Sequence, residues 1–264
     1  MIKVLVIALL LGVFVENYAG SFVAPTGDHP VTMAYLSRRW PDREQGMKAV
    51  EKYASINGQM RPGDDFSVKV SQFGTVDVAV EVCSRVGERH IWVDAEELEH
   101  LPMQREAYFA MKERCASVAI TVQACHAQQA EETLSMLSSG DQVRFVKGYF
   151  NDCTEKNWDT LNENYEKLVK IGIEKGLKRV AIASHHSELV HGLVAGLTPE
   201  QLGRVEVQGM AVFTLSVVDW ARDRGINTHV YQGFGEILYL VQLLPAIDYS
   251  RLPLVYHFRR WYDG

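Results

Sequence analysis

The sequence predicts a single-domain (β/α)8 barrel, regular or distorted. Short runs rich in Val and Ile alternate with longer amphipathic segments along most of the 264 residues, and strands buried on both faces have this composition. There are eight such runs, which is enough to close a parallel barrel. No linker rich in Pro, Gly or Ser divides the chain. An open, doubly wound sheet is the alternative arrangement of the same alternation.

The predicted elements follow one another in chain order. The expected strands are Val31–Leu36, Phe66–Ser71, His90–Ala95, Val118–Ala124, Val143–Lys147, Arg179–Ser184, Arg204–Gln208 and Asn227–Tyr231. Apolar residues recur at helical spacing in the segments between them. The expected helices are Asp42–Tyr53, Glu96–Arg114, Ala127–Leu137, Asn157–Glu174 and Met210–Arg224.

Residues 1–20 form an apolar segment ahead of a barrel predicted over residues 21–264. Lys3 precedes the apolar run Val4–Val15, and small residues follow at Ala19 and Gly20. This order is typical of a secretory signal, but a strand or helix packed within the domain has a similar composition. The run is shorter than the roughly 20 apolar residues of a transmembrane helix. We expect a cytoplasmic protein that can associate with a membrane surface, or an exported protein if the segment is a signal.

Composition limits the classes of function. The chain has 27 Lys and Arg against 33 Asp and Glu, a net charge of -6, which gives no positive field for counterion release on nucleic acid. Nucleic acid is therefore not an expected partner. Cys83, Cys115, Cys125 and Cys153 form no CxxC pair. We expect reduced thiols, because a chain of this length can build a large core without disulfides.

Polar side chains collect where the predicted strands end, and such barrels carry their chemistry on that face. They are Lys69, Asp94, Gln123, Arg144 with Lys147, His185 with His186, Gln208 and Tyr231. Charged groups are rare in strands unless they pair with one another or with a ligand, and the excess of cations favours an anionic ligand. The set lacks the carboxylate pair of glycoside hydrolases. A metal-dependent hydrolase using Asp94, His185 and His186 is an alternative, but no HxH or HExxH spacing is present and we predict no metal site.

Taken in order, these strand ends resemble the proline dehydrogenase family. The similar segments are Phe66–Ser71 (FSVKVS, like SVKLS), Trp92–Glu97 (WVDAEE, like IDAEE), Val122–Ala124 (VQA, like VLQAY), Val143–Gly148 (VRFVKG, like VRLVKGAY), Ala181–His185 (AIASH, like IATH), Val205–Gln208 (VEVQ, like FEFQ), and His229–Tyr231 with Gly235–Glu236 (like VYVPYGE). Each motif is short. Their common order, from about residue 31 to residue 240, makes the set specific.

This resemblance implies a flavin-dependent barrel enzyme that oxidises L-proline, or a related cyclic imino acid, to 1-pyrroline-5-carboxylate by hydride transfer to FAD. The electrons would pass to a quinone or another acceptor. Asp94 and Arg144 are the implied catalytic pair, because a fixed cation stabilises the negative charge on a reduced flavin. The residues that would hold FAD are Ala95, Gln123, Arg144, Val146, Lys147, Gly148, Tyr149, Ser184, His185 and Gln208. Those that would contact the substrate are Lys69, Tyr149, Met210 and Tyr231.

The sequence departs from the family where the substrate carboxylate is expected. The family places two adjacent arginines in its last barrel helix, whereas Leu240–Pro245 contains none and Arg259 and Arg260 occur further on. Tyr149 replaces a small residue, and Asn151 stands where the family has tryptophan. A barrel that binds flavin or another ligand without catalysis is therefore the second hypothesis.

Overall fold

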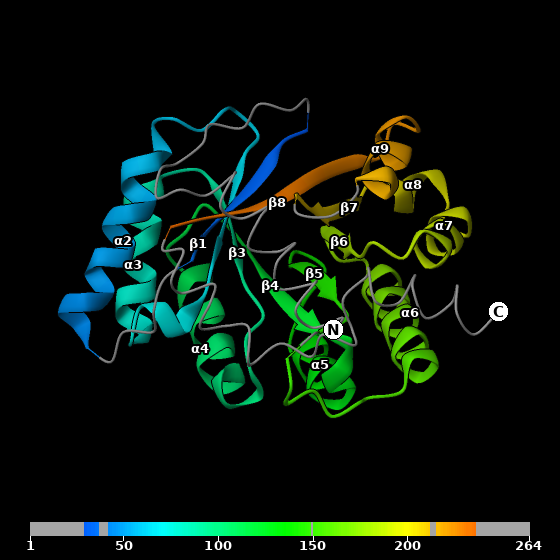
Figure 1. Ribbon diagram of the computed structural model, residues 1–264, viewed down its shortest axis with the longest axis horizontal. Coiled ribbons are helices and arrows are strands. Elements are labelled where there is room, and N and C mark those ends of the chain that lie inside the picture. Colours follow the sequence, from blue (N-terminus) through cyan, green and yellow to red (C-terminus); the bar gives the residue numbers. More distant parts are fainter. Residues whose placement is uncertain (1–28, 37–41, 149, 212–214, 236–264) are drawn as a thin grey trace, which may run out of the picture.

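The computed structural model describes residues 29–36, 42–148, 150–211 and 215–235. Within these ranges, parallel strands β1 to β8 form a closed barrel in chain order, and helices lie around the outside of the strands (Figure 1). The register of the closing pair runs from Val31 opposite Val230 to Leu36 opposite Gly235. The predicted (β/α)8 barrel is confirmed, and the open sheet is wrong because β8 pairs with β1.

The observed strands match the predicted runs to within a few residues at most ends. They are β1 (Val31–Leu36), β2 (Asp65–Val68), β3 (His90–Val93), β4 (Ser117–Gln123), β5 (Gln142–Val146), β6 (Arg179–Ala183), β7 (Val205–Met210) and β8 (Asn227–Gly235). The prediction is wrong at the end of β2. This strand stops at Val68, the last of its residues that β3 pairs, and Val70–Gln72 form a 3-10 helix. Met210, predicted to begin a helix, is the last residue of β7.

The helices alternate with the strands. They are α2 (Arg43–Asn57), α3 (Val76–Val86), α4 (Leu101–Lys112), α5 (Ala127–Ser135), α6 (Trp158–Glu174), α7 (Ser187–Ala195), α8 (Pro199–Leu202) and α9 (Ser216–Arg222). Side-chain caps define two of the starts, because Asp42 accepts a hydrogen bond from the Gln45 amide and Asn157 accepts one from the Asp159 amide. The predictions for α2 and α6 are therefore close, whereas α3, α7 and α8 were not predicted.

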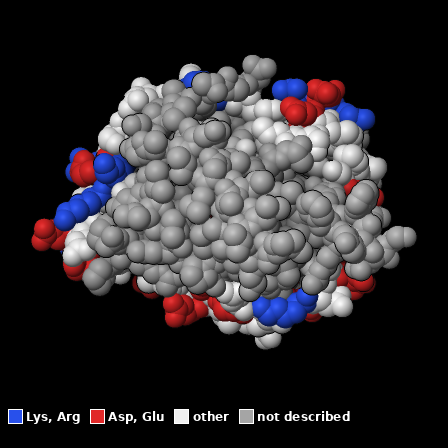
Figure 2. All heavy atoms as spheres, in the orientation of Figure 1, with Lys and Arg blue, Asp and Glu red and all other residues white. Residues whose placement is uncertain are grey.

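Three predicted features lie outside the described residues: the apolar segment 1–20, Tyr149, and the chain from residue 236 to residue 264. Among the helices that are described, none is both long and apolar enough to cross a membrane. In the view of Figure 2, described acidic and basic side chains lie mixed around the edge of the visible face. Exposed ion pairs between described residues include Lys167–Glu131 and Arg85–Glu51.

The cysteines form two disulfides, so the predicted reduced thiols are wrong. Cys83 in α3 bonds to Cys115, just after α4, with 4.8 Å between the Cα atoms. Cys125, just after β4, bonds to Cys153 in the segment after β5, with a Cα separation of 5.3 Å. The partners are 32 and 28 residues apart. Each bond joins neighbouring βα units, which come together because their strands pair side by side in the sheet.

Candidate functional site

The interior of the barrel contains two polar clusters, because alternate residues of each strand point inward. The lower cluster, near the amino-terminal ends of the strands, consists of Asp65, Arg179, Glu206 and His229. The upper cluster, toward the carboxyl-terminal ends, consists of Lys69, Asp94, Arg144 and Tyr231. A buried apolar group of Trp92, Ala119 and Ala181 accompanies them. The Trp92 ring lies 5.2 Å from the Arg144 guanidinium and 4.8 Å from that of Arg179, so it separates the two clusters.

Asp94, the residue after β3, is the centre of the upper cluster. Its Oδ2 accepts hydrogen bonds from Lys69 Nζ at 3.0 Å and from the Tyr231 hydroxyl at 2.9 Å, and its Oδ1 accepts from Arg144 Nη2 at 2.6 Å. Burial alone would raise the pKa of this carboxyl, but the charges of Lys69 and Arg144 lower it to about 2. Asp94 is therefore a carboxylate at neutral pH. It is suited to positioning these three groups and not to exchanging a proton.

The Arg144 guanidinium is held from several sides, yet one nitrogen makes no hydrogen bond. Its Nε donates to Thr121 Oγ1 at 3.0 Å, and Nη2 also donates to Ser67 Oγ at 2.8 Å. Nη1 is buried and has no partner among the residues that the structure describes. A buried donor without an acceptor costs free energy. This atom therefore marks a place where a bound ligand would supply the missing acceptor.

Among the described residues, the upper cluster contains two cations and one carboxylate. Lys69 and Arg144 both form ion pairs with Asp94. Glu96, in the same loop, directs its carboxylate to Ser71 instead, accepting from the Ser71 amide at 3.0 Å and from its hydroxyl. The buried Arg144 guanidinium, with one donor that has no described acceptor, suits an anionic ligand.

Ser67, Thr121 and Gln104 belong to this site, and sequence reasoning missed them. Gln104, from α4, donates to the backbone carbonyls of Asp94 at 2.7 Å and of Thr121 at 2.9 Å. Ser67 and Thr121 each lie two positions before a predicted site residue, so the alternation of the strands could have identified them. Nothing in the sequence marks Gln104, because only the packing of α4 on the barrel brings its amide to the site.

Ala95 and Gln123, predicted to hold the cofactor, lie beside the upper cluster. The Ala95 carbonyl accepts from Lys69 Nζ at 3.1 Å, and Gln123 Nε2 donates to the Glu96 carbonyl at 2.7 Å. These bonds join the loop after β3 to the ends of β2 and β4. Val146, also predicted, is the last residue of β5 and lies opposite Gln123 in the register.

Lys147 forms a second cationic centre at the end of β5. Its Nζ lies 2.6 Å from Asn162 Oδ1, 3.2 Å from His186 Nδ1 and 5.4 Å from the Trp158 ring centroid. No ion pair holds it within the described part of the chain, and burial lowers its pKa to about 7. Asn162 and Trp158 were not predicted as site residues. A buried amine among neutral partners is suited to binding an anion that would favour its protonated form.

The predicted residues on β6 and β7 make local contacts. His185 Nε2 accepts from the Met210 amide at 2.9 Å, and Ser184 Oγ accepts from the His186 amide at 3.2 Å. Gln208 turns toward the lower cluster, where its Nε2 donates to Glu206 Oε1 at 2.5 Å. The structure thus brings Lys69, Asp94, Arg144 and Tyr231 together. The predicted residues Ser184, His185, Gln208 and Met210 make separate, local contacts instead.

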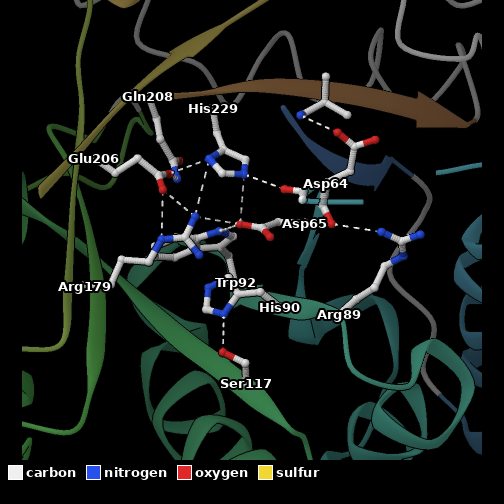
Figure 3. A network of polar contacts seen from close by, with 12 residues as sticks. Asp64, Asp65, Arg89, His90, Trp92, Ser117, Arg179, Glu206, Gln208 and His229 are labelled. Carbon is white, nitrogen blue, oxygen red and sulfur yellow. Dashed lines mark hydrogen bonds and ion pairs between the residues drawn. The ribbon is translucent and has the colours of Figure 1, made fainter. Parts of the chain in front are cut away.

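The lower cluster was missed as a group, although Glu206 and His229 stand two positions before the predicted residues Gln208 and Tyr231. Figure 3 shows Arg179 between Asp65 and Glu206, with Nη2 2.9 Å from Asp65 Oδ2 and Nε 2.9 Å from Glu206 Oε2. His229 Nδ1 lies 3.1 Å from Glu206 Oε1, and its Nε2 lies 2.9 Å from the Gly63 carbonyl. Both ring nitrogens face acceptors, so the imidazole must be protonated to donate from both.

The pKa of His229 agrees with this geometry. Burial alone would lower it, but the carboxylates of Glu206 and Asp65 raise it overall. With Arg179 and His229 as cations and Asp65 and Glu206 as carboxylates, the lower cluster is balanced in charge. Each charged group of the lower cluster therefore has a partner of opposite charge within the cluster. The upper cluster differs, because its Arg144 Nη1 has no described hydrogen-bond partner.

The fold and the polar face together define a (β/α)8 barrel with a proline dehydrogenase-like fold. Several solved structures of proline utilization A are similar to it, among them those from three organisms. The protein from Bdellovibrio bacteriovorus, inactivated by N-propargylglycine, matches with a TM-score of 0.71 at 14% identity, over 89% of this chain. The protein from Bradyrhizobium japonicum matches with a TM-score of 0.69 at 15% identity over 81% of this chain. That from Corynebacterium freiburgense matches with a TM-score of 0.61 at 13% identity over 99% of this chain.

These likenesses concern the fold, because the identities are low. The chain matches 31%, 27% and 30% of the lengths of those three proteins, so it spans less than a third of each. No protein-family model matches the sequence, and no curated protein matches it. The fold agrees with the one that the strand-end motifs imply.

Proposed function

We propose that this protein is a flavin-dependent dehydrogenase that oxidises L-proline, or a related cyclic imino acid, to the corresponding cyclic imine. For proline the product is 1-pyrroline-5-carboxylate. The observation that carries the proposal is the buried Arg144 guanidinium, which Asp94 holds in place while its Nη1 stays without a partner among the described residues. A preorganised cation in a site shielded from water is what a reaction needs when it deposits negative charge on a cofactor.

The residues at this face fit FAD, which supplies a hydride acceptor when it is bound. Among the described residues the Nη1 group of Arg144 has no acceptor, so it would be able to donate to a cofactor atom that gains negative charge. Lys147, whose pKa is lowered to about 7 by burial, would be kept protonated by the negative charge of the pyrophosphate, and Gly148, with a φ of 90°, lets the backbone come close. The remaining proposed contacts are those of Ala95, Gln123, Val146, Tyr149, Ser184, His185 and Gln208.

The substrate is proposed to lie over the upper cluster. Lys69 and Tyr231 are directed by Asp94, so their polar atoms have fixed positions before a substrate arrives. Met210, at the end of β7, and Tyr149 are the other proposed substrate contacts. Asp94 acts in this proposal as the group that orients Arg144, Lys69 and Tyr231, since its low pKa makes it a poor proton donor.

Electrons are proposed to pass from the flavin to a quinone or another acceptor, which a protein touching the membrane surface could reach. The two disulfides support folding in an oxidising compartment, because reducing compartments keep thiols free. Of the two locations expected from the sequence, we therefore propose the exported one.

A barrel that binds flavin or another ligand without catalysis is the second candidate. It is favoured by one observation, the absence of arginine from Leu240–Pro245. The metal-dependent hydrolase is not proposed, because the described residues do not assemble it. The oxygens of Asp94 already accept from Lys69, Arg144 and Tyr231, and His185 Nε2 accepts from a backbone amide.

The absorbance spectrum of the purified protein tests the proposal. We expect a yellow protein, or one that becomes yellow after incubation with FAD, whose visible flavin band is bleached by L-proline in the absence of oxygen. A colourless protein that takes up no FAD would exclude a flavoenzyme. A flavin band that neither proline nor other cyclic imino acids change would favour the binding protein.

A further inference from the structure

The disulfide between Cys125 and Cys153 lies directly beneath the turn that contains Lys147 and Gly148. Both cysteines are buried, and the Cys125 amide donates to the Lys147 carbonyl at 2.9 Å. The Cys125 carbonyl accepts from the Glu155 amide at 3.1 Å. One residue at the end of β4 is thus bonded to both ends of the segment that follows β5.

Gly148 is in contact with the disulfide itself. A Cβ atom at this position would lie 2.3 Å from Cys125 Sγ and 3.1 Å from Cys153 Sγ, distances too short for any other residue without a shift. The same Cβ would lie 3.1 Å from Gln123 Oε1. The φ of 90° at Gly148 also requires glycine. The backbone of the turn therefore rests on the two sulfur atoms and on the Gln123 amide.

We propose that the Cys125–Cys153 disulfide positions the Lys147–Gly148 turn for the phosphate groups of the cofactor. The inference rests on the proposed function, because Gln123, Lys147 and Gly148 are cofactor contacts only if FAD binds here. Its physical basis is preorganisation: a cross-link that fixes the turn before binding removes the ordering cost that the ligand would otherwise meet. Lys147 then reaches Asn162 and His186 from a fixed backbone.

The other disulfide provides a matched control. Cys83–Cys115 joins α3 to the end of α4, and the backbone hydrogen bonds of these cysteines run to Gly87 and Met111, neither of which is a proposed cofactor contact. Its partners are 32 residues apart, against 28 for Cys125–Cys153. Since the chain-entropy effect of a cross-link depends on loop length, the two bonds should contribute similarly to global stability. A difference between their removals then reports on the turn.

The experiment compares C125S/C153S with C83S/C115S in two measurements. The first is the dissociation constant for FAD, followed by flavin fluorescence. We expect it to rise at least tenfold in C125S/C153S and to stay within twofold of the wild-type value in C83S/C115S. The second, made without FAD, is hydrogen exchange at the backbone amides of residues 125 and 155. We expect exchange at these amides to accelerate at least tenfold in C125S/C153S only.

The two measurements separate this inference from the proposed function. If the wild-type protein binds no FAD, the proposed function fails, and hydrogen exchange still decides whether the disulfide holds the turn. Unchanged exchange in C125S/C153S, or FAD affinity equal to that of the wild type, overturns the inference. Equal losses in both variants also overturn it, because the effect would then be one of general stability.

If C125S/C153S does not fold, the bond is reduced in folded C83S/C115S with a dithiol. The disulfide takes up two electrons and two protons to give two thiols, and the reagent becomes a cyclic disulfide. Faster exchange at residues 125 and 155 supports the inference. Retained protection at these amides overturns it, and this includes the case in which one zinc ion is bound per chain. The ligand atoms of Cys125, His126 and Cys153 lie within 4.8 Å of one another, so in that case metal coordination would hold the turn without a covalent bond.

Discussion

The upper and lower clusters of the barrel have similar residues but differ in how completely their described groups are paired. Each contains an arginine bonded to a carboxylate and lying against the Trp92 ring, although Arg144 is fully buried and Arg179 only partly. In the lower cluster Arg179 and His229 face two carboxylates, whereas in the upper cluster Arg144 and Lys69 share one. Each charged group of the lower cluster thus has a partner of opposite charge within it. In the upper cluster Arg144 Nη1 is a buried donor without a described partner, which a ligand would satisfy.

This contrast suggests that the two ends of the barrel have different roles, ligand binding at one end and stability at the other. In (β/α)8 proteins the carboxyl-terminal face carries activity, and the opposite face contributes to stability. Here the same division is visible in charge and hydrogen bonding alone. Changes in the lower cluster should therefore alter folding without altering ligand binding, and changes in the upper cluster should do the reverse.

The largest effect on stability is expected from Glu206→Gln. This change keeps the shape of the side chain but leaves Arg179 and His229 with Asp65 as their remaining carboxylate. Breaking a buried ion pair in this way costs about 3–5 kcal/mol of unfolding free energy, measured by urea denaturation. FAD affinity of the folded protein should not change. Glu131→Gln, in an exposed pair with Lys167, is the control and should leave stability almost unaltered.

The next effect is a loss of activity in Arg144→Ala. Removing a preorganised donor of this kind lowers the rate of flavin reduction about 10²–10³-fold, as measured by anaerobic stopped-flow absorbance. Because Asp94 keeps its ion pair with Lys69 when Arg144 is removed, the loss of stability should be smaller than in Glu206→Gln. Arg144→Lys, which retains the charge but not the forked donor geometry, should fall between Arg144→Ala and wild type. Normal reduction rates in Arg144→Ala would remove this residue from the catalytic pair.

The barrel and the centre of its site could be predicted from the sequence because strand alternation reports directly on side-chain direction. Val-rich runs located β1 to β8, and the polar residue closing each run located Lys69, Asp94, Arg144 and Tyr231. The lower cluster occupies the same inward face, two residues before the predicted residues on β7 and β8 and, on β2, four residues before Lys69. Those positions were read as ordinary strand residues, since no resemblance drew attention to them.

Other parts of the structure depend on contacts that no local pattern records. The disulfides join residues that become neighbours only when consecutive βα units pack side by side. Gln104 reaches Asp94 because of the position of α4, and Lys147 turns to Asn162 because α6 passes beside β5. A single sequence shows whether the side chain of a strand residue points into or out of the barrel. It does not show which helix will contact that side chain.

A smaller effect is expected in the pH dependence of stability. The pKa of His229 is raised in the folded protein, so its contribution is complete below about pH 6.5, the unfolded value, and is lost as pH rises through the folded pKa. His229→Gln should therefore reduce the unfolding free energy at pH 6, and reduce it by less at pH 9. Lys147, whose pKa is lowered to about 7, acts in the opposite direction above pH 7. The measurement is therefore the difference between wild type and variant across pH, and a constant difference would contradict it.

The smallest effect is expected from Tyr231→Phe. This variant tests whether the Tyr231 hydroxyl, which is bonded to Asp94, positions the substrate. The hydroxyl is one of three donors to the Asp94 side chain from other strands, the others being Lys69 and Arg144. Its loss removes one charge-assisted hydrogen bond, about 1.5 kcal/mol, while the two cations keep the carboxylate ionised. If Tyr231 positions substrate, the KM for proline should rise several-fold while FAD affinity stays constant. Lys69→Met is the comparison, because it removes a cation of the upper cluster and should weaken the binding of the substrate carboxylate more strongly. A Tyr231→Phe protein that loses FAD affinity instead would place the phenol on the cofactor side of the upper cluster.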